Sequence, residues 1–422
     1  MGTKDGHFAA EEFRRQGHRM VDWIAEYLDG GARRYPVLAR VSPGDVAGRL
    51  PSEMPSAGED PDAVWQDFLE VVLPGVTHWN HPGFMAYFGI TGSGPGILGE
   101  LLSAGLNVNG MLWRTSPSAT EVELEVLQWL RRALELPEDF FGFLTDTASV
   151  SSMLGLAAAR EAGGLDIRQR GMSGRSDLPA LRVYASDQSH SSIAKACVAL
   201  GLGLDGYRPI AHDADYRMDT AALAAAIATD RAAGRLPLAV VATVGTTSTT
   251  SVDPVREIAR ICTAEGLWLH VDAAYAGSAA LCPELRWALD GCELADSFVF
   301  NPHKWMFTPI DCSALYTRHR ELFRRAFSLV PEYLSTPLGG SAHAVDLMDY
   351  GVQLGRRFRA LKLWWVLRCF GLEGIRERIR EHLRLARGFA AFIDREPAFE
   401  RMAPVPFSVV CFRARPAGVE GA

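Results

Sequence analysis

Cysteine is scarce in this sequence and follows no pattern. The 422 residues include 7 cysteines, and no two of them form a CxxC pair. This dispersion argues against a disulfide framework and against a zinc site built from paired cysteines, and it favours reduced thiols in the cytoplasm. The opening residues, MGTKDGHFAAEEFRR, lack the apolar core of a secretory signal. We therefore expect a cytoplasmic protein.

Long apolar runs and an excess of basic residues are also missing. No stretch approaches the roughly 18 apolar residues that a membrane-spanning helix needs, so we expect no membrane partner. Lys and Arg total 43 against 50 Asp and Glu, which gives a formal net charge of −7. This balance argues against nucleic-acid binding as the main function. With 48% hydrophobic and 22% charged residues, the composition is that of a folded protein.

The spacing of apolar residues indicates three parts of the chain. Residues 11–28 carry apolar side chains at helical spacing, and residues 36–62 are rich in Pro, Ser and Gly, which is typical of a connector. We therefore expect a helical arm with its connector over residues 1–75, a large domain over 76–355 and a small C-terminal domain over 356–422.

From residue 181 onwards, short β-branched runs alternate with helical runs such as 219–233 and 254–265. Strands that are apolar on both faces and alternate with helices predict an α/β architecture with a mainly parallel sheet. Ligands bind at the carboxyl ends of such strands, so polar residues directly after each strand are candidate site residues. The expected strands are 181–186, 238–244, 267–273, 297–301 and 313–317.

Two helices are expected before the first of these strands. Residues 119–136 have a helical pattern, and Thr120 with Glu123 matches a capping box. A second helix covers residues 150–161, and the backbone N–H groups of Ala148 and Ser149 at its start would suit a phosphate group. For this segment, an ordinary Ser/Thr N-cap is the simpler alternative.

Lys304 follows the strand 297–301 and has apolar and aromatic neighbours. Trp305, Met306 and Phe307 come directly after it in the sequence. Such surroundings would desolvate the amine and lower its pKa, and a neutral amine can attack a carbonyl to form a Schiff base. Taken alone, a lysine at a strand end is more often a solvated cap.

Asp272, at the end of the strand 267–273, strengthens the chemical interpretation of Lys304. Pyridoxal phosphate (PLP) requires an acid beside its pyridine nitrogen and a lysine at its aldehyde. A carboxylate about 4 Å from a pyridinium gains on the order of 4 kcal/mol at an effective dielectric near 20. The alternative for Asp272 is a helix N-cap. His190 could stack on the cofactor ring and Thr246 could contact it, although a structural histidine and a simple turn are the plainer interpretations.

These residues lie in stretches that resemble the aromatic-L-amino-acid decarboxylases, the group II PLP-dependent decarboxylases. The similarity spans residues 13 to 413, and HVDAAYAG followed by NPHKW is its most specific part. The matching stretches are FRRQGHRMVDWIAEY, PGVTHWNHP, MAYF, SPSATEVELEVLQWL, SDQSHSS, VATVGTTSTTSVD, WLHVDAAYAGSA, ADSFVFNPHKW and LGRRFRALKLW.

The resemblance implies an aspartate-aminotransferase-like fold (PLP-dependent transferase, fold type I) with an N-terminal helical arm, and a homodimer with shared active sites. Lys304 would carry PLP, Asp272 would pair with its ring nitrogen, and His190 would stack on the ring and orient the substrate carboxylate. Tyr333 matches a loop tyrosine that protonates the substrate carbon. The other implied cofactor-binding residues are Ala148, Ser149, Thr246, Ala274, Asn301 and His303.

The implied reaction is decarboxylation of an aromatic L-amino acid (tryptophan, tyrosine, phenylalanine or DOPA type) to the amine and CO2. Some relatives oxidise the intermediate to an aldehyde, and they tend to carry Phe at the loop position or Asn at the stacking position. Tyr333 and His190 are the decarboxylase residues at both places. We therefore expect the amine as product.

The resemblance also indicates the residues that line the substrate pocket. Asn109 and Met111 stand where Ile and Phe are usual, and an Asn in that wall would need a hydrogen-bond partner. Gly355 stands where some tyrosine-selective plant relatives carry Ser, and the extra room favours an indole or another large ring. The implied lining residues are Trp79, Tyr87, Phe88, Asn109, Met111, Leu354 and Gly355.

Several alternatives stay open. They are an aldehyde synthase, a decarboxylase of a non-aromatic amino acid, and an inactive relative that acts as a binding protein. Family members continue beyond the position of Ala422, which implies a shortened small domain, with the strand expected at 407–413 left as an exposed edge. A metal-dependent hydrolase is poorly supported, because His78 and His81 have no third ligand at a suitable spacing.

Overall fold

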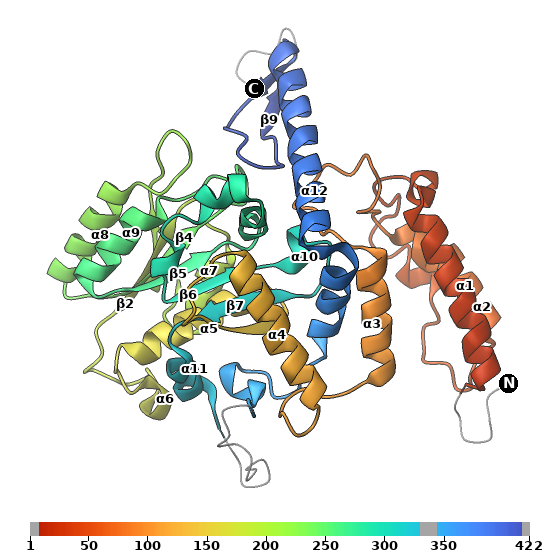
Figure 1. Ribbon diagram of the computed structural model, residues 1–422, viewed down its shortest axis with the longest axis horizontal. Coiled ribbons are helices and arrows are strands. Elements are labelled where there is room, and N and C mark those ends of the chain that lie inside the picture. The colour runs from red at the N-terminus through yellow and green to blue at the C-terminus, as the bar shows by residue number, and fades with distance from the viewer. Residues whose placement is uncertain (1–7, 330–343, 416–422) are drawn as a thin grey trace. The chain divides into compact units, whose positions relative to one another are not determined.

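The computed structural model describes residues 8–329 and 344–415 (Figure 1). It divides into two compact units, Met1–Gly89 and Ile90–Ala422. The three-part division with boundaries at residues 75 and 355 stays a prediction. Tyr333 lies outside the described residues. No helix within the described ranges is both long and apolar enough to span a bilayer.

The N-terminal unit is built around two helices, α1 (Ala10–Leu28) and α2 (Pro61–Asp67). The helix expected at 11–28 is confirmed. Trp23 on α1 packs edge-on against Trp65, with ring centroids 6.3 Å apart, so the helical spacing of apolar residues serves a small aromatic core. His78 is buried, and its Nδ1 lies 2.9 Å from the Tyr27 hydroxyl. This pairing gives His78 a structural partner.

The larger unit contains a seven-stranded sheet in the order β1-β7-β6-β5-β4-β2-β3. β7 is antiparallel to both of its neighbours, and the pairs among β6, β5, β4, β2 and β3 are parallel. The predicted mainly parallel sheet is therefore confirmed, whereas β1 and β3 were not predicted. The strands are β1 (Phe141–Thr145), β2 (Leu181–Ser186), β3 (Tyr207–Ile210), β4 (Leu236–Thr243), β5 (Trp268–Asp272), β6 (Ser297–Phe300) and β7 (Ser313–Thr317).

Helices cover this sheet, which explains why its strands are apolar on both faces. α5 contacts β1, β7, β6, β5 and β4, and α8 and α9 lie side by side next to β4 (Figure 1). The helices of this part are α3 (Gly94–Leu106), α4 (Pro117–Ala133), α5 (Ala148–Ala162), α6 (Ile167–Arg170), α7 (Ser192–Ala199), α8 (Thr220–Ala232), α9 (Val255–Glu265), α10 (Pro302–Trp305) and α11 (Arg320–Phe327).

The capping box predicted for α4 is wrong. The helix begins at Pro117, and the hydroxyl of Ser116 accepts the N–H of Ala119 as its cap. Glu123 is instead buried, where it accepts the N–H of Leu144 at 2.8 Å and pairs with Arg356 at 2.7 Å. A buried tertiary ion pair thus uses the carboxylate that the local pattern assigned to capping.

The C-terminal part consists of the long helix α12 (Arg359–Arg395) and a small two-stranded sheet. Gly371 interrupts α12 with a φ of 64°, so the helix is kinked there. The strand predicted at 407–413 is wrong in extent. Only β9 (Phe412–Ala414) forms, and it pairs antiparallel with β8 (Phe399–Arg401).

Candidate active site

The predicted site residues follow the ends of different strands in one sheet. Asp272 ends β5, and it pairs in register with Thr243 of β4 and Val299 of β6. Lys304 and His190 follow β6 and β2. Because parallel strands end at the same edge, the sheet gathers these side chains at one place, as the strand-end argument predicted.

Lys304 lies on the short helix α10, directly after β6. Its backbone N–H donates to the Asn301 carbonyl at 3.0 Å. The side chain is partly buried, and desolvation lowers its pKa below the ordinary value, while the nearby Asp272 carboxylate opposes the shift. The environment therefore raises the fraction of neutral amine at Lys304, as a Schiff-base lysine requires.

Asp272 is a buried carboxylate, only 5% exposed. Its Oδ1 accepts the N–H of Ala274 at 3.0 Å, which fixes the side chain at the end of β5. The carboxylate lies close enough to Lys304 and His190 to oppose the lowering of their pKa values that burial causes. A buried, oriented negative charge is the group that a protonated pyridine nitrogen needs.

His190 presents a defined tautomer. Its Nδ1 accepts the backbone N–H of Ser192 at 3.1 Å and lies 2.9 Å from the Ser192 hydroxyl. Although part of the residue is accessible, desolvation lowers its pKa, and the charge of Lys304 lowers it further. The imidazole is therefore neutral near pH 7, with its proton on Nε2 as an available donor.

Asn301 and His303 form a buried pair beside Lys304. The Nδ1 of His303 accepts the N–H of Cys312 at 2.9 Å, and its Nε2 lies 3.3 Å from the amide group of Asn301. Burial, helped by Lys304, lowers the pKa of His303 to about 4, so its ring is neutral. Asn301 is 2% exposed, and its Oδ1 has no hydrogen-bond partner among the described residues.

The start of α5 offers backbone donors at the same sheet edge. Ala148 is the first residue of this 15-residue helix and Ser149 follows it, but no side chain caps the helix. The simple N-cap alternative is therefore wrong for Thr147, whose N–H is held by Asp146 at 2.7 Å. An uncapped helix start next to β1 suits a phosphate group.

Thr246 and Ala274 lie at the ends of β4 and β5. Both are buried. The Thr246 hydroxyl accepts the N–H of Ser251 at 2.9 Å and lies 3.0 Å from the hydroxyl of Thr249. Most of its hydrogen-bonding capacity is thus used inside the protein. The Ala274 carbonyl accepts the N–H of Asn301 at 3.0 Å, which links the turns after β5 and β6.

These residues fit PLP on three independent points. The uncapped start of α5 can hold the phosphate, the buried Asp272 can pair with the ring nitrogen, and Lys304 can bond the aldehyde.

The predicted substrate-lining residues fall into two groups. Trp79, Tyr87 and Phe88 belong to the N-terminal unit, where Trp79 stacks on Tyr87 with ring centroids 5.8 Å apart. Asn109, Met111, Leu354 and Gly355 belong to the larger unit. There, the Asn109 Oδ1 accepts the N–H of Arg356 at 2.9 Å, and its Nδ2 lies 3.5 Å from the Met111 sulfur.

Sequence reasoning missed two residues that support this edge. The buried Asp253 accepts the N–H of Thr243 at 2.8 Å and the N–H of Met218 at 2.7 Å, so it anchors the end of β4 next to Asp272. Thr91 bonds the turn after Lys304. Asp253 follows a strand end in the VGTTSTTSVD stretch, so the strand-end argument could have identified it. No local sequence pattern marks Thr91.

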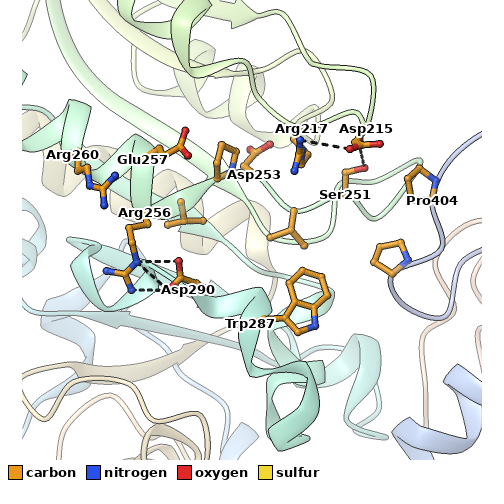
Figure 2. Close-up of a pocket in the computed structure, with 14 residues that line it drawn as sticks. Asp215, Arg217, Ser251, Asp253, Arg256, Glu257, Arg260, Trp287, Asp290 and Pro404 are labelled. Carbon is orange, nitrogen blue, oxygen red and sulfur yellow. Dashed lines mark hydrogen bonds and ion pairs between the residues drawn. The ribbon is translucent and has the colours of Figure 1, made fainter.

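A cavity of about 520 Å³ lies elsewhere in the larger unit, and Figure 2 shows its lining. Asp253 lines this cavity, but none of the predicted catalytic, cofactor-binding or substrate-lining residues does. Its charged groups are largely paired with one another, since Arg256 binds Asp290 at 2.7 Å and Arg217 lies 3.6 Å from Asp215 (Figure 2). We therefore assign the chemistry to the edge around Lys304. The described residues also contain no cluster of ligands suited to a metal ion.

Known proteins match along nearly the whole chain. The family model for the pyridoxal-dependent decarboxylase conserved domain matches residues 43–415. Tyrosine decarboxylase 2 of Narcissus pseudonarcissus is 41% identical over 96% of this chain and 82% of that protein. Phenylacetaldehyde synthase of Arabidopsis thaliana is 42% identical over 96% of this chain and 83% of that protein.

A solved structure agrees with this similarity. The Oryza sativa TDC with PLP and tryptamine superposes with a TM-score of 0.92 and 39% identity, over 96% of this chain and 84% of that chain. The match therefore covers the sheet, the loop of Lys304 and the helices around them. From both its sequence and its fold, this chain belongs to the pyridoxal-dependent decarboxylase family, whose cofactor is PLP.

Proposed function

We propose that this enzyme removes the carboxylate of an aromatic L-amino acid and releases the arylalkylamine and CO2. The observation that carries the proposal is the meeting of buried Asp272, desolvated Lys304 and neutral His190 at one sheet edge. The names of the relatives, a tyrosine decarboxylase and a structure that holds tryptamine among them, support an aromatic substrate.

Each residue has a role that follows from its environment. Lys304 holds the cofactor, and when bound PLP supplies an electron sink for the pair that CO2 leaves behind. Asp272 places a carboxyl group at the buried end of the site, where a low dielectric strengthens its attraction for a positively charged ring nitrogen. His190 donates from Nε2 without adding a second positive charge beside Lys304. The start of α5, with Ala148 and Ser149, binds the phosphate.

We infer that the product is the amine. His190 and Tyr333 are the residues expected of a decarboxylase, and Tyr333 would return a proton to the substrate carbon. The relatives include a phenylacetaldehyde synthase as well as decarboxylases, so their names do not decide between the two products. The aldehyde is therefore the second candidate, and the experiment below separates the two.

We propose two sets of substrate-binding residues, which are Trp79, Tyr87 and Phe88 in the N-terminal unit and the 109–111 and 354–355 segments in the larger unit. The polar atoms of Asn109 are held by Arg356 and Met111, so Asn109 does not require a polar substrate group. An Asn109 side chain in need of a partner would have favoured a polar, non-aromatic substrate, and these contacts remove that argument. Gly355 adds no side chain beside Asn109, whose Nδ2 lies 3.9 Å from the place of a Cβ, which leaves room for a large ring.

We also propose a homodimer that works in the cytoplasm. A stripe of exposed leucines on α3 supports the dimer, because a stable monomer rarely exposes such a row. The stripe consists of Leu98, Leu101, Leu102 and Leu106, which are 44 to 58% exposed. The free thiols of all described cysteines agree with a reducing compartment.

The test is a product assay with purified enzyme and PLP. We expect L-tryptophan, L-tyrosine, L-DOPA or L-phenylalanine to yield CO2 and the matching amine in equal amounts, measured by mass spectrometry. Lys304→Ala serves as the inactive control. Release of hydrogen peroxide and ammonia in step with CO2 would contradict the amine and support the aldehyde. Turnover of glutamate alone would contradict the aromatic substrate.

A further inference from the structure

The backbone leaves its helical path directly after Lys304. α10 ends at Trp305, and Phe307 adopts a φ of 55°, a conformation that bulky residues rarely take. The carbonyl of Lys304 therefore lacks a continuing helix to supply its N–H partner. Something outside this loop must hold the turn in place.

The hydroxyl group of Thr91 bonds both the Lys304 carbonyl and the Phe307 N–H. Its Oγ1 donates to the carbonyl oxygen of Lys304 at 2.9 Å and accepts the N–H of Phe307 at 2.9 Å. The hydroxyl thus stands between the residue that carries the amine and the residue with the unusual backbone. These two contacts join positions 213 and 216 residues apart in the sequence.

A second hydroxyl reinforces the same turn. Ser93 donates to the carbonyl oxygen of Phe307 at 2.7 Å, and its Oγ also caps α3 by accepting the N–H of Gly96 at 3.3 Å. The segment 91–93 is consequently tied both to the turn after Lys304 and to the first turn of α3. These bonds hold the segment 91–93 in a fixed position against the turn after Lys304.

We propose that Thr91 is a positioning residue, which sets where the Lys304 amine stands by fixing the backbone on its carboxyl side. The inference rests on the proposed function only in that Lys304 is the residue that bonds PLP. Without the hydroxyl, the Lys304 carbonyl and the Phe307 N–H lose their partners, and the turn can relax to a less strained backbone. The amine would then stand away from the position at which it bonds the PLP aldehyde, and small displacements of a reacting group have large effects on reactivity.

Thr91→Val removes the hydroxyl and keeps the branched shape, and Thr91→Ser keeps the hydroxyl. Thr229→Val is the matched control, because the Thr229 hydroxyl also donates to a backbone carbonyl, that of Ala225 at 2.8 Å. Thr229 lies at an exposed position of α8, away from Lys304. The readouts are the PLP dissociation constant from tryptophan fluorescence, the fraction of PLP trapped on Lys304 by borohydride, and kcat and KM.

For Thr91→Val, we expect PLP affinity and kcat to fall roughly tenfold, with KM for the amino acid within threefold of wild type. Thr91→Ser should stay within threefold in every measurement. The melting temperature of the chain without PLP should match that of Thr229→Val. A merely structural role would lower that melting temperature and leave the trapped fraction of the folded protein unchanged.

Equal PLP affinity and trapping in Thr91→Val and Thr229→Val would overturn the proposal, and so would a Thr91→Ser variant as defective as Thr91→Val. If Thr91→Val does not fold, the comparison of Thr91→Ser with Thr91→Ala decides, because the two differ by one oxygen. PLP binding and trapping need no substrate. A wild type that traps PLP but releases no CO2 therefore refutes the proposed function and leaves Thr91 testable.

Discussion

At the scale of single residues, the buried Asp272 carboxylate has the clearest chemical consequence. Replacing it with Asn keeps an acceptor for the Ala274 N–H but removes the negative charge. A charge pair at about 4 Å in a partly buried site is worth on the order of 4 kcal/mol, so we expect kcat to fall roughly a thousandfold. Steady-state kinetics at saturating PLP measure this loss.

Asp219→Asn is the control for that experiment. Asp219 also accepts backbone N–H groups, those of Ala221 at 2.8 Å and Ala222 at 3.0 Å, but as the cap of α8. Asn caps helices nearly as well as Asp, so this variant should keep wild-type kcat. Full activity in Asp272→Asn would refute the assigned role of the charge.

Asp253 makes the stability of the fold depend on pH. Burial raises the pKa of its carboxyl group to about 6, although two backbone N–H groups oppose the shift. The folded chain therefore holds this proton more tightly than the unfolded chain, where the pKa is about 4. The contribution of Asp253 to the free energy of unfolding is complete below about pH 4 and is lost as the pH rises through 6, by about 3 kcal/mol.

Urea unfolding of wild type and Asp253→Asn from pH 4 to pH 7 tests this expectation. The variant places an amide NH2 against a backbone donor, so it should be less stable at every pH. Its pH profile, however, should lack the decline between pH 4 and 6 that the carboxyl group causes. Parallel profiles across that range would contradict the raised pKa.

At the scale of elements, α12 contains two glycines with opposite requirements. Gly371 has a φ of 64° at the kink, whereas Gly388 is exposed inside the helix and has open space around its Cβ position. We expect Gly388→Ala to stabilise the chain by up to about 1 kcal/mol, because Ala is a better helix former. Gly371→Ala should destabilise it by about 1–2 kcal/mol, because an L-residue is strained there.

Thermal unfolding of both variants beside wild type measures the two effects under identical conditions. The comparison controls itself, since the same substitution is made in the same helix. Two changes of equal sign would mean that the kink at Gly371 is not required by the fold.

The start of α4 shows how a tertiary contact can override a local sequence pattern. Glu123 matched a capping box with Thr120, yet its carboxylate meets Arg356 in the interior, 233 residues away. A sequence window of a few residues contains no trace of such a partner. The strand-end argument placed Asp272 and Lys304 correctly at one sheet edge, because it depends only on the parallel strands that the alternation of strands and helices already specifies.

At the scale of the whole molecule, the proposed dimer predicts a dependence on the leucine stripe of α3. Leu101→Glu should weaken self-association, because it places a charge in an apolar contact. Leu385→Glu on α12 is the control, since both leucines are 53% exposed. Light scattering coupled to gel filtration should show half the wild-type mass for Leu101→Glu only. Equal masses for both variants would argue against α3 as the interface.

Much of the larger unit follows from the sequence, but the reversed direction of β7 does not. The run at 313–317 was expected as a strand, and β7 has those bounds, yet nothing in SALYT reveals that it runs against its neighbours. The strands β1 and β3 were missed because Gly142 in β1 and Pro209 in β3 interrupt their short apolar runs. Contacts such as Thr91 with Lys304 depend on how distant segments pack.

The reversed direction of β7 has a consequence for the lysine itself. β6 and β7 are consecutive in the chain and pair directly, with Phe300 opposite Ala314, so the connection between them begins and ends at the same edge of the sheet. Lys304 lies on this connection, which is therefore a loop closed at its base. In the proposed role of Lys304, its amine would have to stand at the same position for every reaction cycle. Because both ends of the loop are fixed in the sheet, the backbone of Lys304 can move only a short distance, and the amine stays close to its starting position.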